Sequence, residues 1–437
     1  MITGTPYRRL SFFERFRYPR QIDFDNALNH HAVVAGMSGT GKSSLLKVMA
    51  LQEFNHSVVL IDTHRDAFID TLHACIELDI DPSRVIIIDP TTPQYGTIIL
   101  DPLRIAGVDP YVCVDSLLAA CRGVWRDAWG ARMEDCLRRL FLTLQATNLP
   151  LSAGLTFLED EKMHRLILTK VNDPELENFW QYFFKYHRAD IESSRNKLSS
   201  FLLNPFVKPM FDRAGSNIDF YDAFKNGKII LINLSRNYFK DDSSRGFLGA
   251  IFLSMVYNAL LQRENDKERR SVVILADEVH EYYIPEFVNP FLTGGRKYGA
   301  GLKMFTQSLG HFKPHDLEII FSTVGSIISF AVGYADAKRL VDELFTFRND
   351  AIVKHQKRDM FGGYGDKTFY SAGEQRQHAL TELMEQAQRE VLVRVKKRHG
   401  NETYIGQVTD VPEFQVSPEE ESEYRRESAK HHGYTNP

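Results

Sequence analysis

The sequence predicts an α/β fold with a mostly parallel sheet, interrupted by a long all-helical segment. Short apolar runs that end beside a polar residue are typical of strands buried on both faces of a parallel sheet, and this chain has several. Helical patterns alternate with these runs, as they do in α/β folds. The stretch 103–222 contains helical patterns alone, which predicts an insertion rather than more sheet.

Each expected strand is a short run of alanine, valine, leucine or isoleucine. In chain order these strands are 32–35, 58–61, 85–88, 229–232 and 272–275. The first runs directly into a glycine-rich loop, and a stretch of good helix formers, 44–51, follows that loop. Farther on, 391–395 and 403–408 alternate apolar and polar residues like the two strands of a hairpin.

The central stretch shows the spacing of amphipathic helices. Apolar side chains fall on one helix face at Met133, Cys136, Leu137, Leu140, Phe141 and Leu144. A helix is also expected over 189–203, stopping near Pro205, and another begins at Asp173-Pro174-Glu175, with proline in its first turn. The three tryptophans, which we expect in the core of this insertion, are Trp125, Trp129 and Trp180.

A chain of 437 residues exceeds one compact core, so two domains or one domain with a large insertion are expected. We predict an α/β domain formed by 25–102 and 223–410, with the all-helical insertion at 103–222. A basic arm, 1–24, precedes this domain, and we interpret it as solvated, with DNA contact as the alternative. The tail, 411–437, is acidic and short on apolar residues, which predicts disorder.

The composition is that of a soluble globular protein, with 43% hydrophobic and 25% charged residues. The net charge of −4 gives no global attraction for nucleic acid, so any such binding depends on local patches or a pore lining. The four cysteines show no C-x-x-C pairing, which indicates reduced, mostly buried thiols in a cytoplasmic protein.

No signal peptide or membrane span is expected. The amino-terminal stretch is rich in arginine and has no apolar core, unlike a signal peptide. No run reaches the ~20 apolar residues that a membrane span needs. The longest candidate, 247–261, contains Gly249, Ser254 and Asn258, which favours a core helix.

The glycine-rich loop matches the phosphate-binding P-loop pattern G-x-x-x-x-G-K-[ST] at every position. Residues 36–43 read Gly-Met-Ser-Gly-Thr-Gly-Lys-Ser, between an expected strand and an expected helix, which is the context the motif requires. Loop N–H groups and the helix N-terminus together form a concave site suited to phosphate oxygens. The glycines let the backbone approach those oxygens without Cβ clashes.

The motif predicts ATP and Mg²⁺ as ligands. Lys42 is expected to reach the β- and γ-phosphates, and the Ser43 hydroxyl to hold Mg²⁺. The residues that we expect to contact the nucleotide are Gly36, Met37, Ser38, Gly39, Thr40, Gly41, Lys42, Ser43 and Ser44.

Hydrolysis of a phosphoanhydride also needs a metal ligand and a group that orients water. Three expected strands end beside an acid, at Asp62, at Asp89 and at Asp277-Glu278. Only the last supplies two adjacent carboxylates, so we predict that Asp277 holds Mg²⁺ through water and Glu278 polarises the attacking water. The nearby His280 is given no catalytic role.

Two further polar residues follow the acidic pair. A strand over 302–305 that ends at Thr306-Gln307 would place Gln307 near the γ-phosphate as a sensor of hydrolysis. Arg296, in the stretch Gly295-Arg296-Lys297-Tyr298-Gly299, is the best candidate for an arginine finger that reaches a neighbouring subunit's nucleotide. A solvent-facing Arg-Lys pair is the alternative for that position.

Several stretches together resemble the HerA–FtsK superfamily of DNA-pumping ATPases. They are 36–43, Val59-Leu60-Ile61-Asp62-Thr63-His64, 229–234, Leu275-Ala276-Asp277-Glu278, and 295–299 with Thr306-Gln307. Within it, the chain looks most like the coupling-protein (TraG/TraD-like) branch of type IV secretion and conjugation, which carries an all-helical domain between its two nucleotide motifs. The resemblance covers roughly residues 25–345 and includes 195–205 and Leu248-Gly249-Ala250. Coupling proteins commonly begin with membrane-spanning helices, and this chain departs from that pattern.

The resemblance implies a RecA-like motor of the ASCE type that assembles as a homohexamer and hydrolyses ATP to ADP and phosphate. ATP would lie at subunit interfaces and DNA, single- or double-stranded, would thread the central pore. Grip on the phosphate backbone implies sequence-tolerant, salt-dependent binding. Basic residues in candidate pore loops, each equally compatible with plain surface, are Arg245, Lys267, Arg269 and Arg270.

Two other functions stay open. One is viral genome packaging or HerA-type DNA processing, which uses the same kind of motor. The other is a nucleotide-switched scaffold that binds a protein partner through the helical insertion or the amino-terminal arm. The intact Lys42, Asp277 and Glu278 argue against an inactive ATPase, but they do not separate a switch from a motor.

Overall fold

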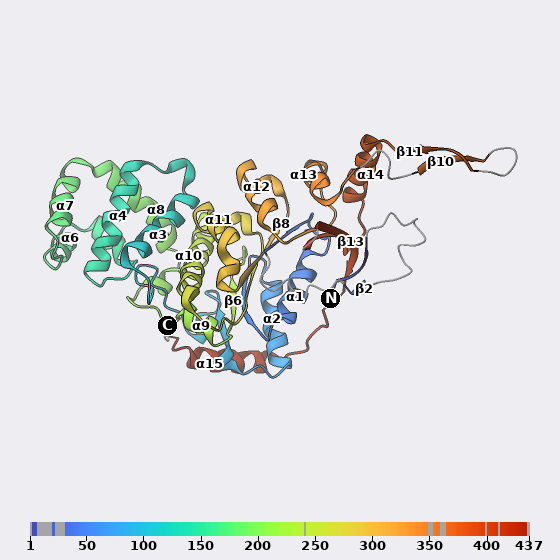
Figure 1. Cartoon of the computed structure of the whole chain (residues 1–437). Coiled ribbons are helices and arrows are strands. Elements are labelled where there is room, and N and C mark those ends of the chain that lie inside the picture. The colour runs from blue at the N-terminus through green and yellow to red at the C-terminus, as the bar shows by residue number, and fades with distance from the viewer. Residues whose placement is uncertain are drawn as a thin grey trace. The chain divides into compact units, whose positions relative to one another are not determined.

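The computed structural model describes residues 2–6, 20–21, 31–239, 242–347, 353–358, 364–397, 400–409 and 411–434 (Figure 1). The chain divides into two compact units. The first comprises residues 1–49 and 302–411, and the second comprises 50–301 and 412–437.

The first unit contains a mixed run of strands in the order β2-β1-β13-β12-β9-β3-β8. Its strands are β1 (Ile2–Pro6), β2 (Arg20–Gln21), β3 (Ala32–Ala35), β8 (Ala300–Thr306, which starts at the unit boundary), β9 (Ser326–Ser329), β12 (Glu390–Lys397) and β13 (Gly400–Val408). Strands β8, β3 and β9 are parallel and fully buried, whereas β12, β13, β1 and β2 add antiparallel pairs. The predicted hairpin of 391–395 and 403–408 is confirmed as β12 and β13.

Helices and a separate hairpin complete the first unit. They are α1 (Lys42–Gln52, which crosses the unit boundary), α12 (Pro314–Thr323), α13 (Tyr334–Leu344), α14 (Ala372–Met384), and the paired strands β10 (Val353–Arg358) and β11 (Tyr364–Phe369). A capping box starts α14, because Ser371 and Glu374 satisfy each other's backbone N–H groups.

The second unit contains four parallel strands in the order β7-β4-β6-β5. They are β4 (Ser57–Asp62), β5 (Val85–Ile88), β6 (Ile229–Asn233) and β7 (Val272–Ala276). Every residue of these strands is buried, as the uninterrupted apolar runs predict. Helices outside the central segment are α2 (Asp66–Glu77), α9 (Phe220–Lys225), α10 (Asp242–Leu261), α11 (Pro285–Gly294) and α15 (Pro418–His431).

Between β5 and β6 the chain is helical. The helices are α3 (Pro110–Val124), α4 (Ala131–Ala146), α5 (Ala153–Glu159), α6 (Glu161–Leu168), α7 (Pro174–Tyr186) and α8 (Arg188–Leu202) (Figure 1). The predicted apolar face is the buried face of α4, and the Trp180 indole N–H donates to Thr143 Oγ1 at 2.9 Å in the core. The segment belongs to the same compact unit as β4–β7, so a separate insertion domain stays a prediction.

Short 3₁₀ helices join many of these elements. They are η1 (Pro82–Arg84), η2 (Pro93–Tyr95), η3 (Arg126–Ala128), η4 (Lys208–Phe211), η5 (Gln262–Asn265), η6 (Val279–Glu281), η7 (Gly295–Tyr298) and η8 (Leu309–His311).

One helix in the described part of the chain, Ser243–Asn265, is long and apolar enough to cross a membrane by length and composition alone. The most apolar 18-residue stretch of this helix has a mean hydropathy of 1.3, and 89% of that stretch is buried inside the protein. It packs against α3, α8, α9 and α11, as a core helix does.

The four cysteines are free and buried, and burial raises the pKa of Cys75 and of Cys136 to about 12.

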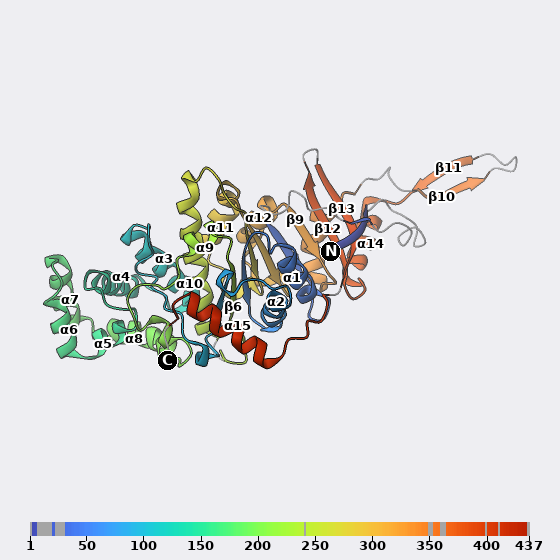
Figure 2. The same cartoon turned by 90° about the horizontal axis from the view of Figure 1, so that it is seen from below.

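The prediction of a disordered tail is wrong, because α15 is an ordered helix that lies beside α2 (Figure 2) and also packs against β5. A capping box of Ser417 and Glu420 starts it. Its docking uses polar groups: Ser428 Oγ donates to the Val85 carbonyl at 2.6 Å, and the Tyr434 hydroxyl donates to the Ile87 carbonyl at 2.8 Å. The tail therefore binds the outer strand β5 with few apolar residues, which is why its composition predicts disorder.

A buried arginine anchors α15. The Arg425 guanidinium donates to Asp89 Oδ2 at 3.2 Å and to Glu421 Oε1 at 2.7 Å. The rings of Phe68 and Tyr95 also lie against it, with centroids 5.5 and 5.6 Å from its central carbon.

Replacing Arg425 by alanine is expected to lower the free energy of unfolding by about 3–5 kcal/mol, because it leaves the Asp89 carboxylate buried without its cation. Chemical denaturation followed by fluorescence measures the change. Arg426→Ala, on the exposed side of the same helix, is the matched control, with an expected change within about 0.5 kcal/mol. Equal effects of the two substitutions would show that the buried pair does not anchor the helix.

Candidate nucleotide site

The phosphate loop in the first unit leaves the sheet between two parallel neighbours. Strand β3 pairs with β8 and with β9, so that Ala35 lies opposite both Thr306 and Ser329. The loop then continues these contacts, because Gly36 N–H donates to the Thr306 carbonyl at 3.4 Å and Met37 N–H donates to the Ala331 carbonyl at 2.9 Å. Both neighbouring strands therefore fix the start of the loop.

At two positions of the loop there is no room for a Cβ atom, so glycine is required. A Cβ at Gly36 would lie 2.6 Å from Phe330 Cβ, a distance at which atoms overlap. Gly41 has a backbone φ of +120°, which residues other than glycine rarely adopt. A Cβ at this position would also lie 3.0 Å from the Phe330 ring. Phe330 thus packs directly against the loop, and only glycine fits at these two positions.

Lys42 directs its ammonium group into the loop. Its side chain is only 8% exposed, and Nζ donates to the carbonyls of Gly36 at 2.7 Å and of Met37 at 3.0 Å. Ser43, the next residue, is exposed at the start of α1, where its hydroxyl is available to a metal ion. This arrangement gathers positive charge inside the loop, as phosphate binding requires.

Gln307 follows β8 directly, so the predicted strand before it is confirmed. Because the Thr306 carbonyl accepts the Gly36 N–H, Gln307 lies next to the start of the phosphate loop within the same unit. Its function as a sensor of the γ-phosphate stays a prediction.

The acidic pair of the second unit lies at the carboxyl end of β7, beside β4. Asp277 N–H donates to the Ile61 carbonyl at 2.9 Å, and Thr63 Oγ1 donates to Asp277 Oδ2 at 3.2 Å. Asp277 is 5% exposed and Glu278 is 1% exposed. Glu278 has left-handed backbone angles, φ 42° and ψ 46°, which are uncommon for a residue other than glycine.

Two histidines flank the Glu278 carboxylate. His280 Nδ1 lies 3.3 Å from Oε2, and His64 Nε2, from the end of β4, lies 4.0 Å from Oε1. Neither histidine has a role that the sequence predicts. A histidine close behind the acid of two strand ends, in Asp62-Thr63-His64 and Glu278-Val279-His280, is the sequence signal for this arrangement.

The other two strand-end acids have structural contacts. Asp62 accepts the backbone N–H groups of His64 at 2.7 Å and Phe68 at 2.8 Å, and burial raises its pKa against the effect of these bonds. Asp89 accepts from Asn233 Nδ2 at 2.9 Å and from Arg425. Asp62 therefore braces the loop after β4, and Asp89 anchors α15. The assignment of the chemistry to Asp277 and Glu278 stays a prediction.

Arg296 lies in η7 and is exposed, as is the adjacent Lys297, so both interpretations of this pair stay open. Of the residues considered for pore loops, Lys267, Arg269 and Arg270 are exposed. Arg245 is buried and pairs with Glu281 at 2.6 Å, so it lies neither in a loop nor on the surface. Arg269 donates to backbone carbonyls, including those of Arg263 at 2.8 Å and Lys297 at 2.5 Å.

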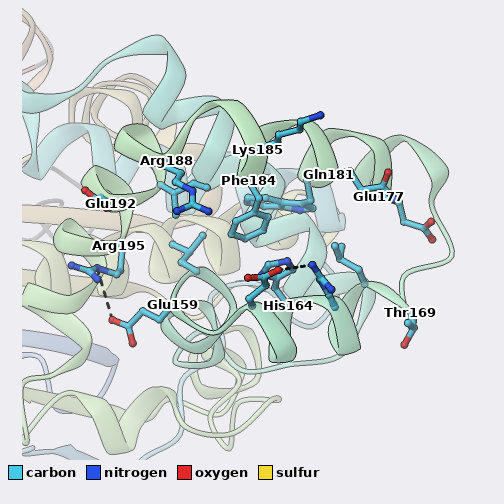
Figure 3. A pocket seen from close by; sticks show the side chains of 16 residues that line it. Glu159, His164, Thr169, Glu177, Gln181, Phe184, Lys185, Arg188, Glu192 and Arg195 are labelled. Atoms are coloured by element: carbon cyan, nitrogen blue, oxygen red, sulfur yellow. Dashed lines mark hydrogen bonds and ion pairs between the residues drawn. The ribbon is translucent and has the colours of Figure 1, made fainter.

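A cavity of about 870 Å³ lies among α5, α6, α7 and α8 (Figure 3). Its apolar wall includes Trp180 and the stacked rings of His164 and Phe184, whose centroids are 3.9 Å apart. Burial lowers the pKa of His164, which favours the neutral ring for this stacking. Charges of both signs line the remainder, at Glu159, Glu161, Arg165, Glu177, Lys185, Arg188, Glu192 and Arg195.

The phosphate loop at the end of a parallel strand and the acidic pair at the end of another define the class of P-loop nucleotide-binding α/β proteins. Among solved structures, the chain is similar to the bacterial conjugative coupling protein TrwBdeltaN70, with a TM-score of 0.62 and 15% identity over 90% of this chain and 88% of that one. It is similar to the plasmid coupling protein TrwB in complex with ADP and Mg²⁺, with a TM-score of 0.60 and 16% identity over 95% of each chain.

VirB4 of Thermoanaerobacter pseudethanolicus has the same fold, with a TM-score of 0.53 and 14% identity over 97% of this chain and 98% of that one. No protein-family model and no curated protein sequence matches the chain. The predicted resemblance to conjugation and type IV secretion ATPases is therefore confirmed for the fold. The mostly parallel α/β architecture is confirmed with it.

Proposed function

We propose that this protein is an ATP-hydrolysing ring motor that translocates DNA, in the manner of a conjugative coupling protein. The observation that carries the proposal is the formed phosphate loop, with Lys42 directed into it, in a chain that shares its fold with TrwB bound to ADP and Mg²⁺. We place this motor in the cytoplasm, as a homohexamer around DNA.

Each chemical role is assigned to a residue that the structure describes. Ser43 would hold Mg²⁺ with its hydroxyl oxygen and Asp277 would hold the ion through water, and the ion would neutralise charge on the phosphates. Glu278 takes a proton from water as the water oxygen bonds to the γ-phosphorus, and the bond from that phosphorus to the ADP oxygen breaks. Lys42 stabilises the charge on the phosphates, Gln307 senses the γ-phosphate, and Arg296 acts on the nucleotide of a neighbouring subunit.

DNA is expected to stimulate ATP hydrolysis, and this stimulation is expected to fall steeply as salt rises, because contacts to the phosphate backbone release counterions. Lys42→Ala is expected to abolish hydrolysis with and without DNA, whereas Lys47→Ala, on the same helix, is the matched control. Phosphate release measured over a range of DNA and salt concentrations tests both points. A rate that does not change with DNA concentration would contradict the motor.

The cavity beside α7 favours a second candidate, a nucleotide-switched scaffold. A wall of Trp180, Phe184 and His164 with charges of both signs around it suits a polypeptide segment better than a nucleic acid. Slow, DNA-independent hydrolysis together with ATP-dependent assembly would support this function. A motor that also binds a protein partner through the cavity would show DNA stimulation as well.

A further inference from the structure

The segment before β12 contacts the phosphate loop, although the two are far apart in the sequence. Arg389 N–H donates to the Thr40 carbonyl at 2.8 Å, and Gln388 Nε2 lies 3.4 Å from the Gly39 carbonyl. All four residues belong to the first unit. The C-terminal hairpin of β12 and β13 is thus attached to the loop that would hold the nucleotide phosphates.

Arg389 has an unusual backbone conformation for an arginine. Its φ is +66°, in the left-handed region that favours glycine. Two hydrogen bonds hold it there: its N–H donates to Thr40, and its carbonyl accepts the Val408 N–H at 2.9 Å. A glycine would adopt this backbone without strain, and residues held in strained conformations cluster at functional sites.

The side chain of Arg389 lies against Gly41, the residue of the loop that precedes Lys42. A Cβ at Gly41 would be 3.1 Å from Arg389 Cγ and 3.2 Å from Arg389 Cα. Only Cδ, Nε and Cζ separate Cγ from the terminal guanidinium nitrogens, so these nitrogens stay within a short reach of the loop. The side chain is half-buried, which leaves it accessible to a ligand of the loop.

We propose that Arg389 binds the phosphates of the nucleotide held by its own phosphate loop, as a second cation beside Lys42. The proposal rests on the proposed nucleotide function. A guanidinium matches the geometry of phosphate oxygens with two parallel hydrogen bonds, which a lysine cannot make. Arg389 would also connect nucleotide occupancy to the hairpin of β12 and β13, since its backbone bonds to both.

Titration of the full chain with Mg·ADP, followed by calorimetry, tests the proposal. Arg389→Gly is expected to weaken ADP binding about tenfold to a hundredfold, the loss typical of one charge-assisted hydrogen-bonding group. Arg389→Lys is expected to recover part of this affinity, because it keeps the charge. The unfolding temperature of the nucleotide-free Arg389→Gly protein is expected to be unchanged or higher, because glycine relieves the strain.

Inorganic pyrophosphate, used as a competitor of ADP, separates a phosphate contact from a contact to the base or ribose. Arg389→Gly is expected to weaken pyrophosphate by the same factor as ADP. Unchanged pyrophosphate affinity, or unchanged ADP affinity, would overturn the proposal.

Two controls complete the experiment. Asp79→Gly changes another left-handed residue, with a φ of 51°, on an exposed turn, and is expected to leave ADP affinity unchanged. Lys42→Ala tests the nucleotide site itself. If Lys42→Ala abolishes ADP binding and Arg389→Gly does not weaken it, only the inference about Arg389 fails. If Lys42→Ala binds ADP normally, the proposed function fails.

Discussion

Replacing Glu278 by glutamine is expected to slow ATP hydrolysis by about 10²–10⁴-fold while nucleotide affinity stays within a few fold. Glutamine keeps the shape of the side chain but cannot accept the proton of the attacking water. The carboxylate is 1% exposed and has His64 and His280 beside it. Single-turnover phosphate release gives the chemical rate, and ADP titration gives the affinity.

Glu286→Gln is the matched control for this experiment. Glu286 lies on α11, is largely exposed and pairs with Arg122 at 3.6 Å, so its substitution is expected to leave hydrolysis unchanged. A Glu278→Gln protein that turns over at the unaltered rate would assign the water-orienting role to another residue. A protein that neither hydrolyses nor binds ADP would instead indicate that the loop after β7 has lost its structure.

Replacing Arg296 by alanine is expected to lower the DNA-stimulated rate by about 10³–10⁵-fold, the range for arginine fingers. Arg296 is exposed on η7, and a finger must be exposed to reach another subunit. Because the substitution removes a surface side chain, the unfolding temperature is expected to stay unchanged. The same phosphate-release assay with saturating DNA measures the rate.

Mixing of variants distinguishes a finger that acts between subunits from one that acts within its own chain. Arg296→Ala and Lys42→Ala are each expected to be inactive alone. Mixed rings contain interfaces with an intact loop from one subunit and an intact arginine from the next, so activity is expected to return in part. Lys297→Ala, the exposed neighbour, serves as the control. Full activity of Arg296→Ala alone would make the Arg-Lys pair plain surface.

The buried strands and the phosphate loop could be predicted from the sequence because their signals are local. Five apolar runs correspond to β3, β4, β5, β6 and β7, and the loop motif occupies consecutive residues. The prediction that Asp277-Glu278, rather than Asp62 or Asp89, acts in hydrolysis also depends on a local signal, the two adjacent carboxylates. The contacts of Asp62 and Asp89 give those two acids structural roles, and the catalytic role of Asp277-Glu278 stays a prediction.

Contacts between distant segments could not be predicted in this way. His64 meets Glu278 only because β4 and β7 pair in parallel, and Arg389 meets the phosphate loop only through the position of β12. The helical structure of α15 could not be predicted for a different reason. Its stability comes from hydroxyl groups and one buried arginine bonded to β5 and Asp89, and hydrophobicity, on which the prediction of disorder depended, does not measure such bonds.

The docking of α15 also restricts how copies of this chain can assemble. Strand β5 is the outermost of the four parallel strands of its unit, and bare outer strands recruit strands from other molecules. Since Ser428 and Tyr434 already bond to the carbonyls of Val85 and Ile87, a second copy cannot extend the sheet there. If copies of this chain assemble at this edge, they meet there through side chains and loops, which can slide past one another, whereas a shared ladder of backbone hydrogen bonds would lock the copies together.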